Sequence, residues 1–73
     1  MKYEWKYFIV LNNEDILHNL VEEKIDDELL ICCDVAVAKS FSSSNELLQW
    51  VKENTSLKVE NGDFHMEVHY LPY

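Results

Sequence analysis

The feature that most constrains the fold of this chain is a 14-residue stretch, Glu28–Phe41, with ten apolar residues and no Gly, Pro or Asn. An apolar run of this kind is typical of a buried strand. We therefore predict that Glu28–Phe41 is the central strand of a small sheet. Alternate residues of a strand point to opposite faces, which predicts a face of large side chains and a face of smaller ones. The large face would carry Leu29, Ile31, Cys33, Val35, Val37 and Phe41, and the other Leu30, Cys32, Asp34, Ala36, Ala38 and Ser40.

Two elements are predicted before this run. Lys2–Leu11 alternates aromatic or aliphatic residues with charged ones and becomes apolar on both faces near its end, which indicates a strand entering the core. Asn13–Ile25 is predicted to be a helix that begins at an Asn N-cap. Its apolar face at helical spacing would consist of Ile16, Leu17, Leu20, Val21 and Ile25.

Two further elements, a helix and a hairpin, are predicted after Glu28–Phe41. Ser43 and Glu46 have the spacing of a capping box, which predicts a second helix that ends near Asn54. This helix would bury Leu47, Leu48 and Val51. Asn61-Gly62 is a strong turn signal and predicts a hairpin between Ser56–Glu60 and Asp63–Tyr70.

These elements together predict a single α+β domain over residues 1–73, in the order β-α-β-α-β-β. Parallel strand–helix–strand links and a terminal antiparallel hairpin would give a four-stranded mixed sheet with two helices on one face. Six of the nine aromatic residues lie in the first and last predicted strands. We therefore expect these two strands to be neighbours.

The charge balance narrows the classes of partner. The chain has 14 acidic residues against six Lys and no Arg, for a net charge of −8. This balance argues against direct contact with nucleic acid or an anionic membrane and favours a basic protein partner. Cys32 and Cys33 are adjacent in an apolar run and are expected to be reduced. Without a visible signal peptide or membrane-spanning run, the sequence predicts a cytoplasmic protein.

The residues that could carry chemistry do not form a catalytic pattern. His65 and His69 are four positions apart, about 13 Å on a strand, which is too far for one metal ion. The serines near residue 43 are accounted for by helix capping, and the single Gly by a turn. We therefore expect no metal, no cofactor and no enzymatic activity.

Acidic residues gather on the outer face of the first predicted helix and at its C-terminal end, with no cation among them. These residues are Asp15, Glu22, Glu23, Asp26 and Asp27. Like charges at one-turn spacing destabilise a helix, which makes a functional reason worth considering; a solvated face that keeps the protein soluble is the alternative. In the functional interpretation the face imitates phosphates and blocks a basic nucleic-acid-binding protein. Small acidic inhibitors of restriction or CRISPR enzymes, encoded by phages or mobile elements, act in this way.

A second hypothesis places the interaction surface on the sheet. The face of small residues could join two copies of the chain as a homodimeric structural or regulatory module; a helix or the C-terminal tail packed on it is the alternative. The residues proposed for this interface are Trp5, Cys32, Ala36, Ala38, His65 and His69.

Overall fold

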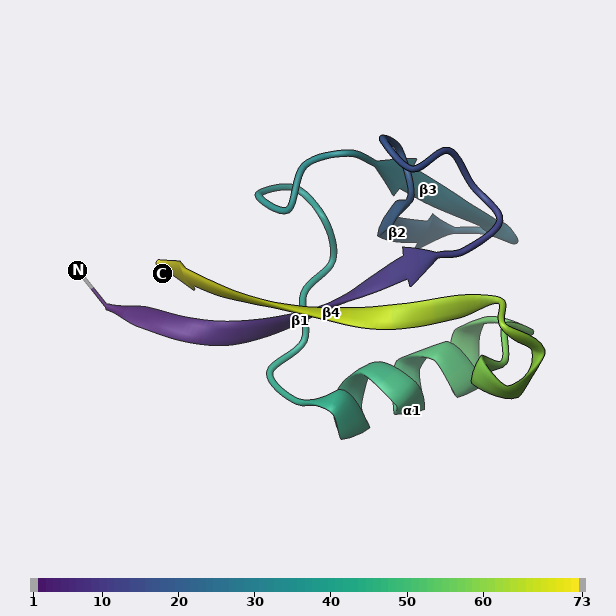
Figure 1. Ribbon diagram of the computed structural model, residues 1–73. Helices are drawn as coiled ribbons and strands as arrows, with labels where there is room; N and C mark the ends of the chain where they lie inside the picture. Colours follow the sequence, from purple (N-terminus) through teal and green to yellow (C-terminus); the bar gives the residue numbers. More distant parts are fainter. Residues whose placement is uncertain (1, 73) are drawn as a thin grey trace.

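The computed structural model describes residues 2–72 and consists of one antiparallel sheet with a helix against one face (Figure 1). The strand order is β3-β2-β1-β4, and every pairing is antiparallel. The predicted β-α-β-α-β-β order and mixed sheet are therefore wrong, because the described residues contain one α-helix and no parallel pair. The elements are β1 (Tyr3–Leu11), β2 (Leu20–Ile25), β3 (Glu28–Cys32), α1 (Ser44–Asn54), the 3-10 helix η1 (Val59–Asn61) and β4 (Phe64–Pro72).

The first and last strands form the longest ladder of the sheet. β1 pairs with β4 over nine residues without interruption, from Tyr3 opposite Pro72 to Leu11 opposite Phe64. The prediction that these strands are neighbours is confirmed. The last four residues of β1 are all buried, because the sheet is covered on both faces at this point.

The segment predicted as the first helix is a loop followed by a strand. Residues 12–19 connect β1 to β2, and Leu20–Ile25 pairs with β3. Leu20 and Val21 are both buried because they point to opposite covered faces of the sheet. Glu22 is the extra residue of a β-bulge, and this bulge hides the alternation that would have indicated a strand.

The predicted central strand, Glu28–Phe41, ends early and at the edge of the sheet. β3 stops at Cys32, and the chain turns at Asp34, whose Oδ1 accepts a hydrogen bond from the Ala36 N–H at 2.9 Å. An Asp side chain that bonds nearby backbone groups favours a turn over a ladder. Residues 33–40, the covering segment, then cross the second face of the sheet before Phe41 pairs with Tyr7.

The second predicted helix is confirmed as α1. The Ser43 Oγ accepts a hydrogen bond from the Glu46 N–H at 3.2 Å, as the capping signal predicted. Leu47 and Val51 are buried as expected, whereas Leu48 is 39% exposed.

The hairpin predicted on Asn61-Gly62 does not form. Asn61 ends η1, and Gly62 caps it at φ 72°, so the positive φ expected of this glycine is present without the hairpin. β4 then pairs with β1 instead of with residues 56–60. The Asn12 N–H donates to the Asp63 carbonyl at 3.1 Å and helps to set this register.

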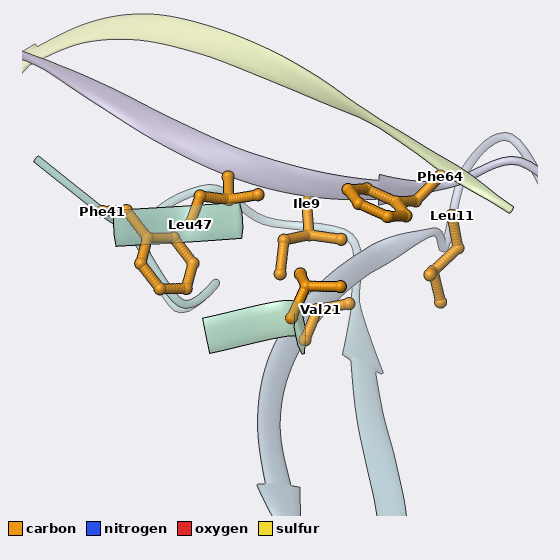
Figure 2. Close-up of a cluster of buried hydrophobic side chains, with 7 residues drawn as sticks. Ile9, Leu11, Val21, Phe41, Leu47 and Phe64 are labelled. Carbon is orange, nitrogen blue, oxygen red and sulfur yellow. The ribbon is translucent and has the colours of Figure 1, made fainter. Parts of the chain in front are cut away.

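Two apolar clusters hold the sheet, one on each face. The first lies between the sheet and α1 (Figure 2) and consists of Ile9, Leu11, Val21, Phe41, Leu47, Val51 and Phe64. The second lies under the covering segment and consists of Phe8, Val10, Leu20 and Cys32.

Candidate functional site

The acidic residues singled out in the sequence gather mainly on the β2–β3 hairpin. Ile25 pairs with Glu28, so Asp26 and Asp27 form a two-residue connection at the tip. All but the half-buried Glu22 are exposed. The group that we call the acidic hairpin consists of Glu22, Glu23, Asp26, Asp27 and Glu28.

Among residues 2–72, the carboxylates of the acidic hairpin differ from most others because they have no partner there. Within residues 2–72, no hydrogen bond or ion pair involves these five side chains. Seven acidic side chains elsewhere do have a partner: Glu4, Asp15, Asp34, Glu46, Glu53, Asp63 and Glu67. The hairpin therefore concentrates negative charge that no contact in the described structure compensates.

A shallow hollow lies beside these carboxylates. Its volume is about 440 Å³, and Ile25 and Leu30, which are 50% and 36% exposed, form its apolar part. Asp26, Asp27 and Glu28 complete the lining. An apolar centre with a charged rim is the usual composition of a protein-binding surface.

Asp26 has a strained backbone. Its φ is 56°, in the left-handed region, where a residue other than Gly costs roughly 1–2 kcal/mol. A two-residue hairpin turn whose positive φ lies at the first residue, as at Asp26 and not at Asp27, is of the type that prefers Gly at this first position. The hairpin thus keeps a carboxylate where folding alone favours another residue, which is the pattern expected of a functional surface.

We expect Asp26→Gly to raise the free energy of unfolding by roughly 0.5–1 kcal/mol, because Gly relieves the positive φ. Asp27→Gly is the matched control, since it removes the same charge at a residue whose φ is not positive. This control should lower stability by roughly 0.5 kcal/mol through the greater freedom of the unfolded chain. Urea unfolding of both variants measures the difference, and equal shifts would show that charge alone is responsible.

Asp15 lies apart from the hairpin, on the loop between β1 and β2. Its Oδ1 accepts a hydrogen bond from the Leu17 N–H at 2.9 Å, so its carboxylate stabilises a local turn. The neighbouring Ile16 and Leu17 are 83% and 79% exposed. The structure therefore places Asp15 beside an exposed apolar pair rather than on one acidic helix face.

The residues proposed for a sheet-face interface are distributed over several surfaces. Cys32 is buried, and Ala36 and Ala38 belong to the covering segment rather than to a strand. The predicted face of small residues therefore does not form, and the segment that carries Ala36 and Ala38 covers this side of the sheet instead. Trp5 is exposed on the α1 side of β1 and lies against Tyr70, with ring centroids 4.9 Å apart and ring planes tilted by 40°.

His65 and His69 lie on the other face of β4, with Glu67 between them. The Nε2 atoms of His65 and His69 are 3.7 and 3.1 Å from the two carboxylate oxygens of Glu67. His69 also packs edge-to-face on Phe8, with ring centroids 5.3 Å apart. Across the described chain, no group of three or more His, Cys, Asp or Glu side chains is arranged to hold a metal ion.

One surface was missed in the sequence. The outer edge of β4 became visible only with the strand order, since the predicted hairpin would have covered one of its edges.

No family model, curated protein or solved structure matches this chain. The function therefore has to be argued from its own residues. The buried side chains among residues 2–72 are all apolar, and no helix there is long and apolar enough to cross a membrane.

Proposed function

We propose that this protein is a non-enzymatic binding protein that presents the acidic hairpin to a basic protein partner. The observation that carries the proposal is the group of five carboxylates without hydrogen bonds or ion pairs in the described structure. With a net charge of −8, the chain attracts a basic partner over long range and accelerates association. Cys32 and Cys33 form no disulfide in the described structure, which supports action in the cytoplasm.

In its narrower form, the proposal assigns the partner to nucleic-acid enzymes, such as the restriction or CRISPR nucleases that phage proteins inhibit. The basic groove of such an enzyme binds phosphates, and carboxylates compete for the same cations. The spacing now comes from strands, whose alternate residues are roughly 6.6 Å apart, rather than from helical turns. The exposed Ile25 and Leu30 add apolar contact, which favours a protein surface as the target.

The proposal is tested with two charge-reversal variants of equal net charge. Glu23→Lys with Asp27→Lys changes the acidic hairpin, and Glu14→Lys with Glu60→Lys changes exposed acids elsewhere. Each pair raises the net charge from −8 to −4. We expect the hairpin variant to retain at least ~10-fold less basic protein from a nuclease-treated bacterial lysate, and the control to change retention less than about twofold.

The narrower form of the proposal, inhibition of a nucleic-acid enzyme, is tested by a cleavage assay. The wild-type protein should inhibit plasmid cleavage by at least one of a set of purified restriction and CRISPR nucleases, and added DNA should compete with it. Raised salt should weaken the inhibition. Equal loss of binding in both charge-reversal variants would mean that net charge alone acts, and the hairpin would then not be the binding surface.

A further inference from the structure

The outer edge of β4 is the longest unpaired strand edge within residues 2–72. β4 has nine residues at one end of the sheet, whereas β3, at the other end, has five. Tyr7 exchanges backbone hydrogen bonds of 2.9 and 3.0 Å with Phe41, on the side of β1 away from β4. Because bonding direction alternates along a strand, the residues on either side of Tyr7 bond to β4. The N–H and C=O groups of β4 that point to the open edge therefore belong to Phe64, Met66, Val68 and Tyr70, together with the C=O of Pro72.

This edge lacks most of the features that usually prevent strands from pairing with other chains. Natural edge strands carry charged side chains, above all Lys, an internal Pro or a bulge, or are short, and the one acidic residue of β4, Glu67, lies between His65 and His69. β4 contains no Lys, its register with β1 is unbroken, and Pro72 is its last residue. Met66, Val68 and Tyr70 are also 37%, 44% and 56% exposed on the α1 side. The edge thus combines free backbone groups with exposed apolar side chains.

The end of the β1–β4 ribbon that carries the two chain termini extends beyond α1 (Figure 1). Tyr70 lies there and stacks on Tyr3, with ring centroids 5.3 Å apart. At the opposite end of β4, a groove of about 570 Å³ lies between the strand and α1. Its apolar lining includes Leu48, Leu57, Val59 and Met66. An exposed aromatic residue at one end of the strand thus accompanies an apolar groove at the other.

We propose that β4 pairs with β4 of a second copy of this chain, antiparallel and centred on Val68, to form a symmetric dimer. Val68 is the middle residue of Phe64–Pro72, so this register uses the whole strand. It brings Met66 opposite the partner's Tyr70 and forms about eight backbone hydrogen bonds. The result is a continuous eight-stranded sheet with a two-fold axis at Val68.

The charges of β4 and the alternation of its side chains between the two faces of the sheet favour this register over neighbouring ones. A shift by one residue would place apolar side chains opposite polar ones and is disfavoured. Centring on Glu67 would oppose two like charges at the closest cross-strand spacing, about 4.5 Å between Cα atoms. Centring on Val68 instead places Glu67 opposite the partner's His69, which is a compatible pair.

The dimer also fills the groove. Opposite Met66, the partner's Tyr70 points to the α1 side and enters the groove lined by Leu48 and Val59, and symmetry repeats this contact. The single chain exposes more surface than is usual for a monomer of its mass, which fits burial of part of that surface in a dimer. Its accessible surface is 5150 Å², whereas monomers of 8.7 kDa average roughly 4,700 Å².

This inference goes beyond the proposed function and is independent of it. In the strand order β3-β2-β1-β4, the acidic hairpin and the dimer edge are at opposite ends of the sheet. The dimer would present two acidic hairpins facing away from each other. Loss of the dimer should therefore leave binding of a basic partner by each hairpin unchanged.

The oligomeric state is measured by sedimentation equilibrium from micromolar to millimolar concentration. We expect the wild-type protein to reach twice the monomer mass of 8.7 kDa. Val68→Lys should raise the dissociation constant of the dimer at least ~100-fold, because two Lys side chains meet at the axis. Val37→Lys, at a similarly exposed Val on the covering segment, is the matched control and should leave the dimer intact. A monomer at every concentration overturns the proposal, and so does a dimer that persists in Val68→Lys. Either result does so whether or not the edge of β4 binds another protein.

The register has a separate test that does not depend on a destabilising variant. In a Cys33→Ser background, Val68→Cys should form a disulfide-linked dimer under mild oxidation, because paired Cα atoms there are about 5.5 Å apart. Glu67→Cys is the control, since its Cα atoms would be beyond the roughly 7 Å limit for a disulfide. Crosslinking through Glu67→Cys but not Val68→Cys would overturn the proposed register.

Discussion

Leu47→Ala is expected to lower the free energy of unfolding by about 3–5 kcal/mol. Leu47 is 0% exposed and lies at the centre of the cluster between α1 and the sheet (Figure 2). The truncation removes apolar burial and leaves a cavity that the rigid sheet on one side cannot close. A chain of 73 residues has a total stability of roughly 4–11 kcal/mol. The variant should therefore be close to unfolding at room temperature.

Urea unfolding at low protein concentration measures this loss. Leu17→Ala is the matched control, since it removes the same atoms from a side chain that is 79% exposed. Its effect should stay within about 0.5 kcal/mol. If the two variants lose equal stability, Leu17 belongs to the core, as the sequence-based helix implied, and the arrangement of α1 over the sheet is wrong.

Phe8→Ala is expected to cost about 3–5 kcal/mol through the cluster on the other face. Phe8 is 1% exposed and lies beneath the covering segment, beside Val35 and Ala38. Its ring also contacts His69, so the truncation removes an aromatic contact worth about 0.5–1.5 kcal/mol as well. Most of the loss should come from burial and from the cavity left under the covering segment.

The matched control for this variant is Val37→Ala on the covering segment. Val37 is 56% exposed, and its truncation should cost less than about 0.5 kcal/mol. A continuous strand over Glu28–Phe41 would place Val37 on the large apolar face, where the same truncation would cost roughly 2 kcal/mol. Thermal or urea unfolding of Phe8→Ala and Val37→Ala therefore distinguishes the two arrangements.

The acidic candidate site was predictable in composition but not in geometry. The sequence shows that Glu22, Glu23, Asp26 and Asp27 are close together, whatever structure they adopt. It does not show that the β-bulge at Glu22 changes which face each carboxylate occupies, because a bulge depends on pairing with β3. Likewise, the open edge of β4 depends on the strand order.

Features that depend on a few neighbouring residues were predictable before the structure was known. These are the cap of α1 at Ser43, the positive φ of Gly62, and the alternation of β1. The charge of −8 and the run of carboxylates are also properties of the sequence alone. Local hydrogen bonds, backbone sterics and charge act over short chain distances, so the residues themselves are sufficient.

Long-range packing determines the secondary structure where the sheet is covered on both faces. Leu20 and Val21 are both buried there, which removes the period-2 signal and leaves spacing that also fits a helix. The apolar run Glu28–Phe41 was divided into an edge strand and a covering segment because Phe8 and Val10 need burial on the second face. Such burial comes from residues distant in the chain, and no local pattern specifies which segment will supply it.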